Sequence, residues 1–211
     1  MTLKRSPDET RLLHVTDRSA WRDWLKTHYK SEHEVWLVYY KKHTGKPRIP
    51  YNDAVEEALC FGWIDSIVKR VDEDSYAQRF SPRKRTSRWS QPNIERMQRL
   101  IKLGKMTPAG LAALKDPALL AAHNQKVKIA PDILKALKAD KQTWVNFQRF
   151  PDMYKRIRIA YIEGSRERGE SEFQKRLQNF LKKTKENKQF SFGGVQCEIL
   201  TPSLNPSSHG F

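Results

Sequence analysis

The sequence predicts an α+β fold, with a small antiparallel sheet flanked by helices and a small helical C-terminal domain after it. Three observations predict this class. Residues 34–41 form an apolar run rich in β-formers. Residues 63–81 contain two strand-like segments around a turn, and apolar residues recur at helical spacing through most of the second half. A chain of 211 residues that is 38% hydrophobic can bury a core in one or two domains.

The elements of the first domain follow in order along the chain. Asp17 is placed to cap a helix near 18–29, which carries an apolar stripe at helical spacing. The buried strand at 34–41 comes next, and glycine and proline then break it. A helix from Tyr51 follows, and Gly62 ends it.

A hairpin and two helices complete this domain. Residues 63–71 and 76–81 are its two strands, and the acidic segment 72–75 is the turn between them. Ser90 is placed to cap a helix that stops at Gly104, and a short helix runs from Thr107 to Leu114. The first domain is therefore expected at residues 1–115.

The second half is expected to be helical. Residues 116–130 lack firm periodicity and are predicted to be a linker. Helical patterning resumes at Pro131 and continues near 152–168 and 171–187, which defines a C-terminal domain at 131–190. Residues 191–211, rich in Gly, Pro, Ser and Asn, are expected to form a flexible tail.

The net charge of +16 is concentrated in one part of the chain. Residues 1–74 hold 13 basic and 13 acidic side chains, whereas residues 75–211 hold 27 basic and 11 acidic ones. A field of one sign attracts polyanions and anionic surfaces. The alternative is a basic surface that only keeps the protein in solution.

Residues 79–90 indicate what this charge could bind. The segment contains five cationic residues together with two aromatic residues, small hydroxyl residues and a proline. Arginine forks match phosphate and carboxylate but offer no proton to transfer, so such a loop indicates binding rather than catalysis. Together with the preceding strand, the loop supplies the predicted ligand-binding residues: Trp63, Asp65, Arg79, Arg83, Arg85, Arg88 and Trp89. The two tryptophans either stack on a planar ligand or cap the core. Asp65 is expected to pair with Arg79 across the hairpin, which would leave Arg83, Lys84 and Arg85 as the outward charges.

Several chemistries find no support in the sequence. The six histidines show no metal-ligand spacing, the glycines form no nucleotide-binding or acyl-transfer motif, and no cofactor or catalytic residue is predicted. Cys60 and Cys197 lie far apart and are expected to be free thiols, Cys60 as a buried structural residue. Neither a membrane span nor a signal peptide is visible, so we expect a cytoplasmic protein.

Several segments carry a resemblance to a known family: Tyr39–Pro47, Tyr51–Asp65, Gln78–Arg83, Ser87–Ser90 and Met106–Leu111. Together they resemble the YdeI/OmpD-associated (bacteriocin-protection) family, closely over about 15–115 and more loosely over 131–190. In the second of these regions, Tyr161 and Ile162 lie near the positions at which the family usually has an aromatic–Ile pair, and Arg168 lies near the position of a family arginine. The resemblance implies a bacterial stress-protection protein without an assigned reaction or cofactor.

Three functional hypotheses follow. In the first, a non-enzymatic protection protein binds an anionic partner, which is nucleic acid, a phosphorylated metabolite or an anionic surface. A chain of +16 would repel cationic peptides, so protection through an anionic partner is the more plausible route. In the second, the chain is an enzyme with Cys60, Asp65 and Arg79 in one pocket. In the third, it binds another protein through the helices at 131–190.

Overall fold

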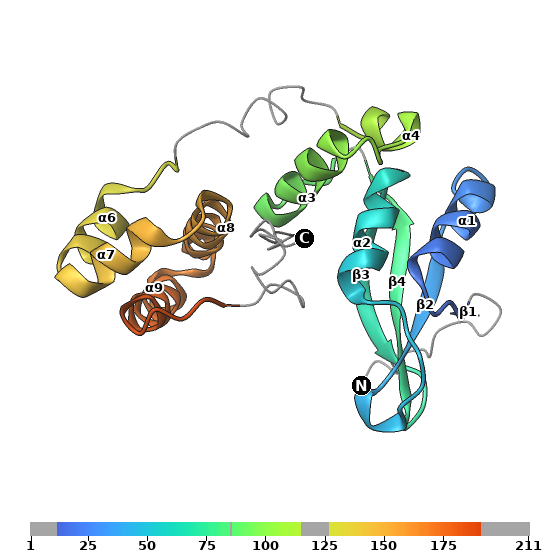
Figure 1. The fold of residues 1–211 in the computed structure, drawn as a ribbon, viewed down its shortest axis with the longest axis horizontal. Helices are drawn as coiled ribbons and strands as arrows, with labels where there is room; N and C mark the ends of the chain where they lie inside the picture. Colours follow the sequence, from blue (N-terminus) through green and yellow to red (C-terminus); the bar gives the residue numbers. More distant parts are fainter. Residues whose placement is uncertain (1–11, 85, 115–126, 191–211) are drawn as a thin grey trace, which may run out of the picture. The chain divides into compact units, whose positions relative to one another are not determined.

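A computed structural model of the chain describes residues 12–84, 86–114 and 127–190. The chain divides into two compact units, residues 1–125 and 126–211 (Figure 1). The first contains a four-stranded sheet with helices, and the second is helical over its described residues, which confirms the predicted α+β class. The predicted tail and most of the predicted linker lie outside the described residues, so those boundaries stay predictions.

The sheet has the strand order β1-β2-β4-β3. β2 (Val35–Tyr40), β3 (Trp63–Arg70) and β4 (Ser75–Pro82) pair antiparallel, which confirms the central strand and the hairpin. The sheet also contains β1 (Leu12–Leu13), which pairs parallel with β2. Two residues are too few to show a strand period in the sequence.

The hairpin contains a β-bulge. Asp65 pairs with Phe80 and Val68 with Gln78, so three steps along β3 match two along β4. At the turn, the Asp72 carboxylate accepts hydrogen bonds from the backbone N–H groups of Asp74 and Ser75, at 2.8 and 2.6 Å. This side-chain turn explains why the acidic segment joins the two strands.

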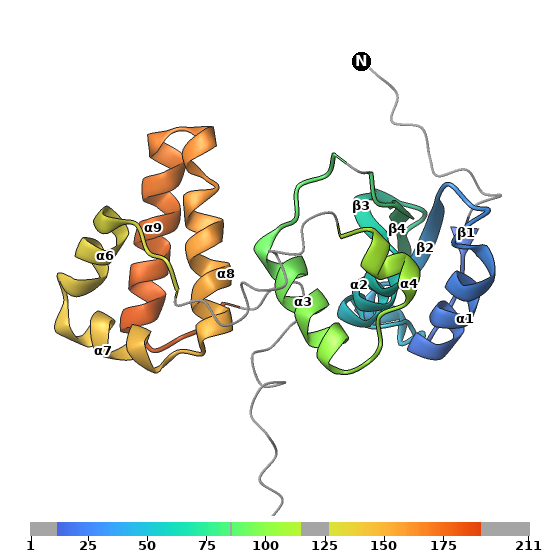
Figure 2. The same ribbon diagram turned by 90° about the horizontal axis from the view of Figure 1, so that it is seen from above.

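Two helices cover one face of the sheet, α1 (Arg18–His28) and α2 (Tyr51–Cys60) (Figure 2). α1 starts as predicted, because the Asp17 side chain accepts from the N–H of Ala20 at 2.9 Å. The main core of the unit lies between helices and sheet and combines Trp21 and Leu25 of α1 with side chains from α2, β2, β3 and β4.

Two further helices complete the first unit, α3 (Gln91–Lys102) and α4 (Pro108–Ala112), and a short 3-10 turn, η2 (Lys42–Thr44), follows β2. α4 approaches the end of α2 so closely that a Cβ atom on Gly110 would lie 2.3 Å from the backbone oxygen of Cys60. The same oxygen accepts from the backbone N–H of Thr107, the N-cap of α4, at 3.2 Å. Glycine at 110 is therefore a steric requirement of this contact.

The second unit contains α6 (Pro131–Lys138), α7 (Lys141–Arg149), α8 (Asp152–Glu163) and α9 (Glu170–Lys185), with the 3-10 turn η4 (Arg166–Arg168) between the last two (Figure 1). The helix expected at 152–168 ends at Glu163. The sequence analysis missed α7, whose start depends on the Asp140 side chain accepting from the N–H of Thr143 at 2.8 Å. Among the described residues, no helix is long and apolar enough to cross a membrane.

Candidate functional site

The end of the hairpin anchors the basic run. β3 and β4 stay paired to Trp63 and Pro82, and one residue later the Arg83 N–H donates to the backbone oxygen of Gly62 at 2.9 Å. The side chain of Arg83 therefore leaves the sheet from a fixed position, although the segment after it is irregular.

The Arg83 guanidinium is held by neutral groups. It lies over the ring of Trp89, with 3.8 Å from Cζ to the ring centroid, and Nη2 donates to the backbone oxygen of Arg88. Its Nε atom is buried and has no hydrogen-bond partner among the described residues. Burial lowers the pKa of Arg83, and within the described parts of the chain no carboxylate forms an ion pair with it.

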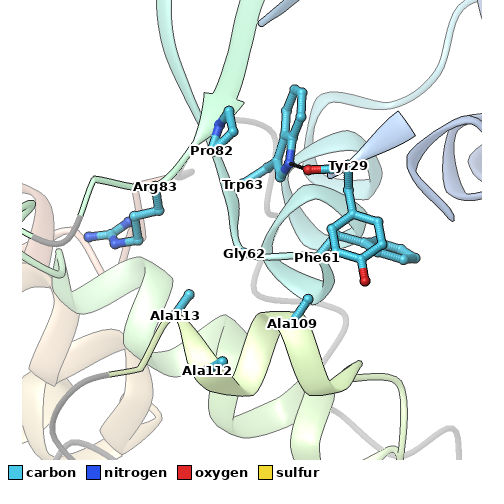
Figure 3. A pocket seen from close by; sticks show the side chains of 9 residues that line it. All are labelled: Tyr29, Phe61, Gly62, Trp63, Pro82, Arg83, Ala109, Ala112 and Ala113. Carbon is cyan, nitrogen blue, oxygen red and sulfur yellow. Dashed lines mark hydrogen bonds between the residues drawn. The ribbon is translucent and has the colours of Figure 1, made fainter. Parts of the chain in front are cut away.

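Arg83 also lines a pocket of about 470 Å³ (Figure 3). The lining residues come from the end of α1, the α2–β3 turn, the end of β4 and α4: Tyr29, Phe61, Gly62, Trp63, Pro82, Arg83, Ala109, Ala112 and Ala113. The volume lies within the range of small-molecule sites. Arg83 is the one charged residue among the described residues of this lining.

Aromatic side chains form the end of the pocket away from Arg83 (Figure 3). The rings of Tyr29 and Phe61 are tilted against each other with centroids 5.5 Å apart. Trp63 is 1% exposed, and its indole N–H donates to the backbone oxygen of Tyr29 at 3.2 Å. These contacts fix the aromatic wall before any ligand arrives.

The turn between α2 and β3 is fitted closely against α4. Gly62 has φ +75°, and a Cβ atom there would lie 3.1 Å from the Ala109 oxygen and 3.2 Å from the Ala113 Cβ. Glycine adopts this backbone conformation without strain and leaves room for the helix.

The predicted ion pair between Asp65 and Arg79 is not formed. Arg79 pairs across the sheet with Trp36, while Asp65 pairs with Phe80. Neighbouring residues on a strand face opposite sides, so a register one residue away from the expected one puts the two charges on opposite faces. Arg79 instead forms an ion pair with Glu34, at 2.6 Å.

Asp65 belongs to a different cluster, between α2, α3 and the sheet. Its carboxylate accepts from the hydroxyl of Tyr51 at 2.6 Å. Burial, together with this hydrogen bond, raises the pKa of Tyr51. Nearby Arg96, whose pKa burial lowers, donates to Asn52 and Asn93. The sequence analysis had not connected these residues.

The other predicted residues divide between the pocket and its surroundings. Trp63 and Arg83 line the pocket, and Trp89 supports the guanidinium while it packs against the core. Arg88 is exposed and contributes its backbone oxygen. Arg85 lies outside the described residues, so its predicted role stays untested.

The alternative site of Cys60, Asp65 and Arg79 is not assembled either. Cys60 is fully buried in the core beneath α4. Burial, together with the Glu57 carboxylate, raises the pKa of the Cys60 thiol to about 11, although Arg22 acts against this. A buried protonated thiol is a poor nucleophile. Among the described residues, no group of three or more His, Cys, Asp or Glu side chains is placed to hold a metal ion.

The sequence analysis missed most of the pocket lining, namely Tyr29, Phe61, Gly62, Pro82 and the α4 alanines. One signal was available. The small-residue run from Ala109 to Ala113 is interrupted only by Leu111, and such runs allow one backbone to approach another closely.

Comparison with protein families gives a match for each unit. Residues 13–113 match a domain of unknown function (DUF8412). Residues 126–187 match the family described as bacteriocin-protection, YdeI or OmpD-associated. This second match covers 62 of the 211 residues of the chain and concerns the C-terminal unit alone. The predicted family is thus confirmed, and its model matches the helical unit, whereas the resemblance was expected to be closer over 15–115. Curated proteins and solved structures give no match.

In this C-terminal unit, the side chain of Tyr161 is 45% exposed. Two guanidiniums contact its ring, with 4.0 Å from the Arg176 Cζ and 4.9 Å from the Arg158 Cζ to the ring centroid. The neighbouring Ile162 is buried in the core of the unit. Of the three residues that the resemblance singled out in this unit, Tyr161 and Arg168 are exposed and Ile162 is buried.

Proposed function

We propose that this YdeI/OmpD-associated protein acts without catalysis, by binding an anionic ligand at Arg83. The observation that carries the proposal is that Arg83 lines an open pocket while no carboxylate of the described residues forms an ion pair with its guanidinium. An anion in this pocket would form charge-assisted hydrogen bonds with the guanidinium and compensate its charge.

The surroundings of Arg83 support the choice of an anion. Its guanidinium is held by an indole ring and a carbonyl oxygen, which orient the side chain but leave its charge uncompensated. The exposed Lys84 and Arg88 in the same loop add positive potential. A bacteriocin-protection role would then act through the anionic partner rather than on a cationic peptide.

The test compares two variants that each remove one positive charge from the loop. Arg83→Gln removes the pocket guanidinium, and Lys84→Gln removes an exposed ammonium group next to it. The full chain is titrated with inorganic phosphate and with a thymidine oligonucleotide by calorimetry. Loss of a charge-assisted hydrogen bond of about 1.5–3 kcal/mol should weaken binding roughly 10- to 100-fold in Arg83→Gln and only a few-fold in Lys84→Gln.

A second measurement reports on the Arg83 guanidinium itself. The side-chain Nε–H signal of Arg83, assigned by its loss in Arg83→Gln, should shift in a ¹H–¹⁵N spectrum as phosphate is added. Equal losses of affinity in the two variants, together with an unmoved Arg83 signal, would overturn the proposal.

A further inference from the structure

The lining of the Arg83 pocket restricts the kind of anion that fits it. Among the described residues, the other eight in the lining carry no charge, and their polar groups are the Tyr29 hydroxyl, the Trp63 indole N–H, which donates to Tyr29, and backbone groups. A polyphosphate or a sugar phosphate would meet one cation among the described lining residues and then rings, methyl groups and backbone groups, none of which compensates a second negative charge. The lining matches a ligand with a single anionic group.

The cation and the aromatic rings lie at different ends of this pocket. Figure 3 shows the Arg83 guanidinium at one end, with Tyr29 and Phe61 at the other and the alanines of α4 along one side. A ligand with its anionic group at Arg83 would therefore place the rest of its body against rings and methyl groups. Burial of apolar surface there would supply most of its affinity.

The small side chains of α4 keep the pocket open. Ala109, Ala112 and Ala113 face it with one methyl group each, and Gly62 opposite has no side chain. Larger side chains on this short helix would fill the space that an apolar body needs. The pocket depth thus depends on alanine at these positions.

We infer that the pocket binds a small amphipathic ligand, whose single phosphate or carboxylate head contacts Arg83 and whose apolar body lies between the aromatic wall and α4. This inference rests on the proposed function and adds the class of ligand. The shared chemistry is one anionic head on an apolar body, which either an aromatic phosphate or an aliphatic carboxylate provides.

Two ligand series test the apolar body in the full chain by calorimetry. One series is inorganic phosphate, phenyl phosphate and 1-naphthyl phosphate, and the other is acetate and decanoate. In the phosphate series, each added ring should raise the affinity by about tenfold or more, given roughly 25 cal/mol for each Å² of apolar surface buried. In the carboxylate series, the alkyl chain of decanoate should do the same. A rise in the first series identifies an aromatic body, and a rise in the second an aliphatic one.

A matched pair of variants locates the binding. Ala112→Leu adds three carbons at an exposed position that lines the pocket, and Ala160→Leu makes the same change at an exposed position on α8. Ala112→Leu should weaken the tighter-binding amphipathic ligand at least tenfold and leave phosphate unchanged, whereas Ala160→Leu should leave both unchanged. In the unmodified chain, the methyl signals of Ala109, Ala112 and Ala113 should shift when 1-naphthyl phosphate is added.

The outcomes separate this inference from the proposed function. If affinity is flat along both series while Arg83→Gln still weakens phosphate binding, the amphipathic ligand is wrong and the anion site stands. If Arg83→Gln changes no affinity, the anion site fails. If Ala160→Leu weakens the ligand as much as Ala112→Leu, the ligand does not bind in this pocket.

Discussion

Replacing Gly110 with alanine should destabilise the first unit, although alanine is the better helix former. The added Cβ would lie 2.3 Å from the Cys60 oxygen and 2.8 Å from the Leu59 oxygen, and both are backbone atoms that cannot rotate away. Ordinary contacts begin near 3.4 Å, so α4 must move by about 1 Å. Overpacking costs typically about 1–3 kcal/mol, and a clash with backbone atoms belongs in the upper part of that range, about 2–3 kcal/mol, against a gain in helix propensity of about 1 kcal/mol.

The net loss should be about 1–2 kcal/mol, which corresponds to roughly 5–15 °C in the melting temperature of a domain of this size. The measurement is urea denaturation followed by tryptophan fluorescence, because five of the six tryptophans lie in the first unit. Gly164→Ala is the control, since Gly164 has φ −63° and meets only the Ala160 oxygen at 3.2 Å. It should change stability by less than about 1 kcal/mol.

Gly110→Ala should also weaken ligand binding, because the pocket residues Ala109, Ala112 and Ala113 move with α4. A variant as stable as the original chain, with unchanged affinity, would refute the close approach of α4 to α2. Greater stability would show that helix propensity outweighs the contact.

Three further predictions concern the interior and the sheet. Glu57→Gln should lower the free energy of unfolding in urea by about 2–4 kcal/mol, because the nearly buried carboxylate of Glu57 forms ion pairs with both Arg18 and Arg22. As a control, Asp23→Asn at an exposed ion pair should lower it by less than about 0.5 kcal/mol. A double-mutant cycle should give a coupling of about 1 kcal/mol between Glu34 and Arg79 and none between Asp65 and Arg79. In a Cys197→Ser background, Cys60 should react with a thiol reagent at pH 8 only after unfolding.

The same thiol predicts a pH dependence of stability. Because burial raises the pKa of Cys60 from about 9 to about 11, its contribution is fully present below pH 9. It is lost as the pH rises from 9 to 11, since the unfolded chain then releases the proton more readily than the folded one. Stability of the Cys60→Ala variant should fall less steeply over this interval. Parallel curves, or fast alkylation of the native thiol, would contradict the buried position.

The parts of the fold that the sequence predicted correctly depend on local chemistry. Asp17 caps its helix as expected, and the acidic turn with Asp72 joins two strands whose patterning is visible without tertiary information. Ser90 precedes α3 as expected, although its side chain makes no capping hydrogen bond. Each of these features is decided within a few residues along the chain.

The parts that the sequence could not predict depend on distant contacts. The Asp65–Arg79 pair was wrong because strand register decides which face a side chain occupies, and composition does not reveal register. The pocket needs Gly110 against Cys60, fifty positions earlier. Arg83 was recognised as a ligand-binding candidate, but only the structure shows that one of its donors is buried and unsatisfied.

The bulge in β3 has a consequence for the behaviour of this protein in concentrated solution. β3 is an edge strand, and its residues Ile67 and Val68 are 53% and 56% exposed. An exposed apolar edge strand commonly pairs with a strand of another molecule, because its backbone hydrogen-bonding groups are unpaired. The extra residue interrupts the regular spacing of backbone donors and acceptors beside this apolar pair, and Lys69 and Arg70 follow at once. An incoming strand would meet a broken ladder and two positive charges, so the apolar edge is protected against intermolecular β-aggregation.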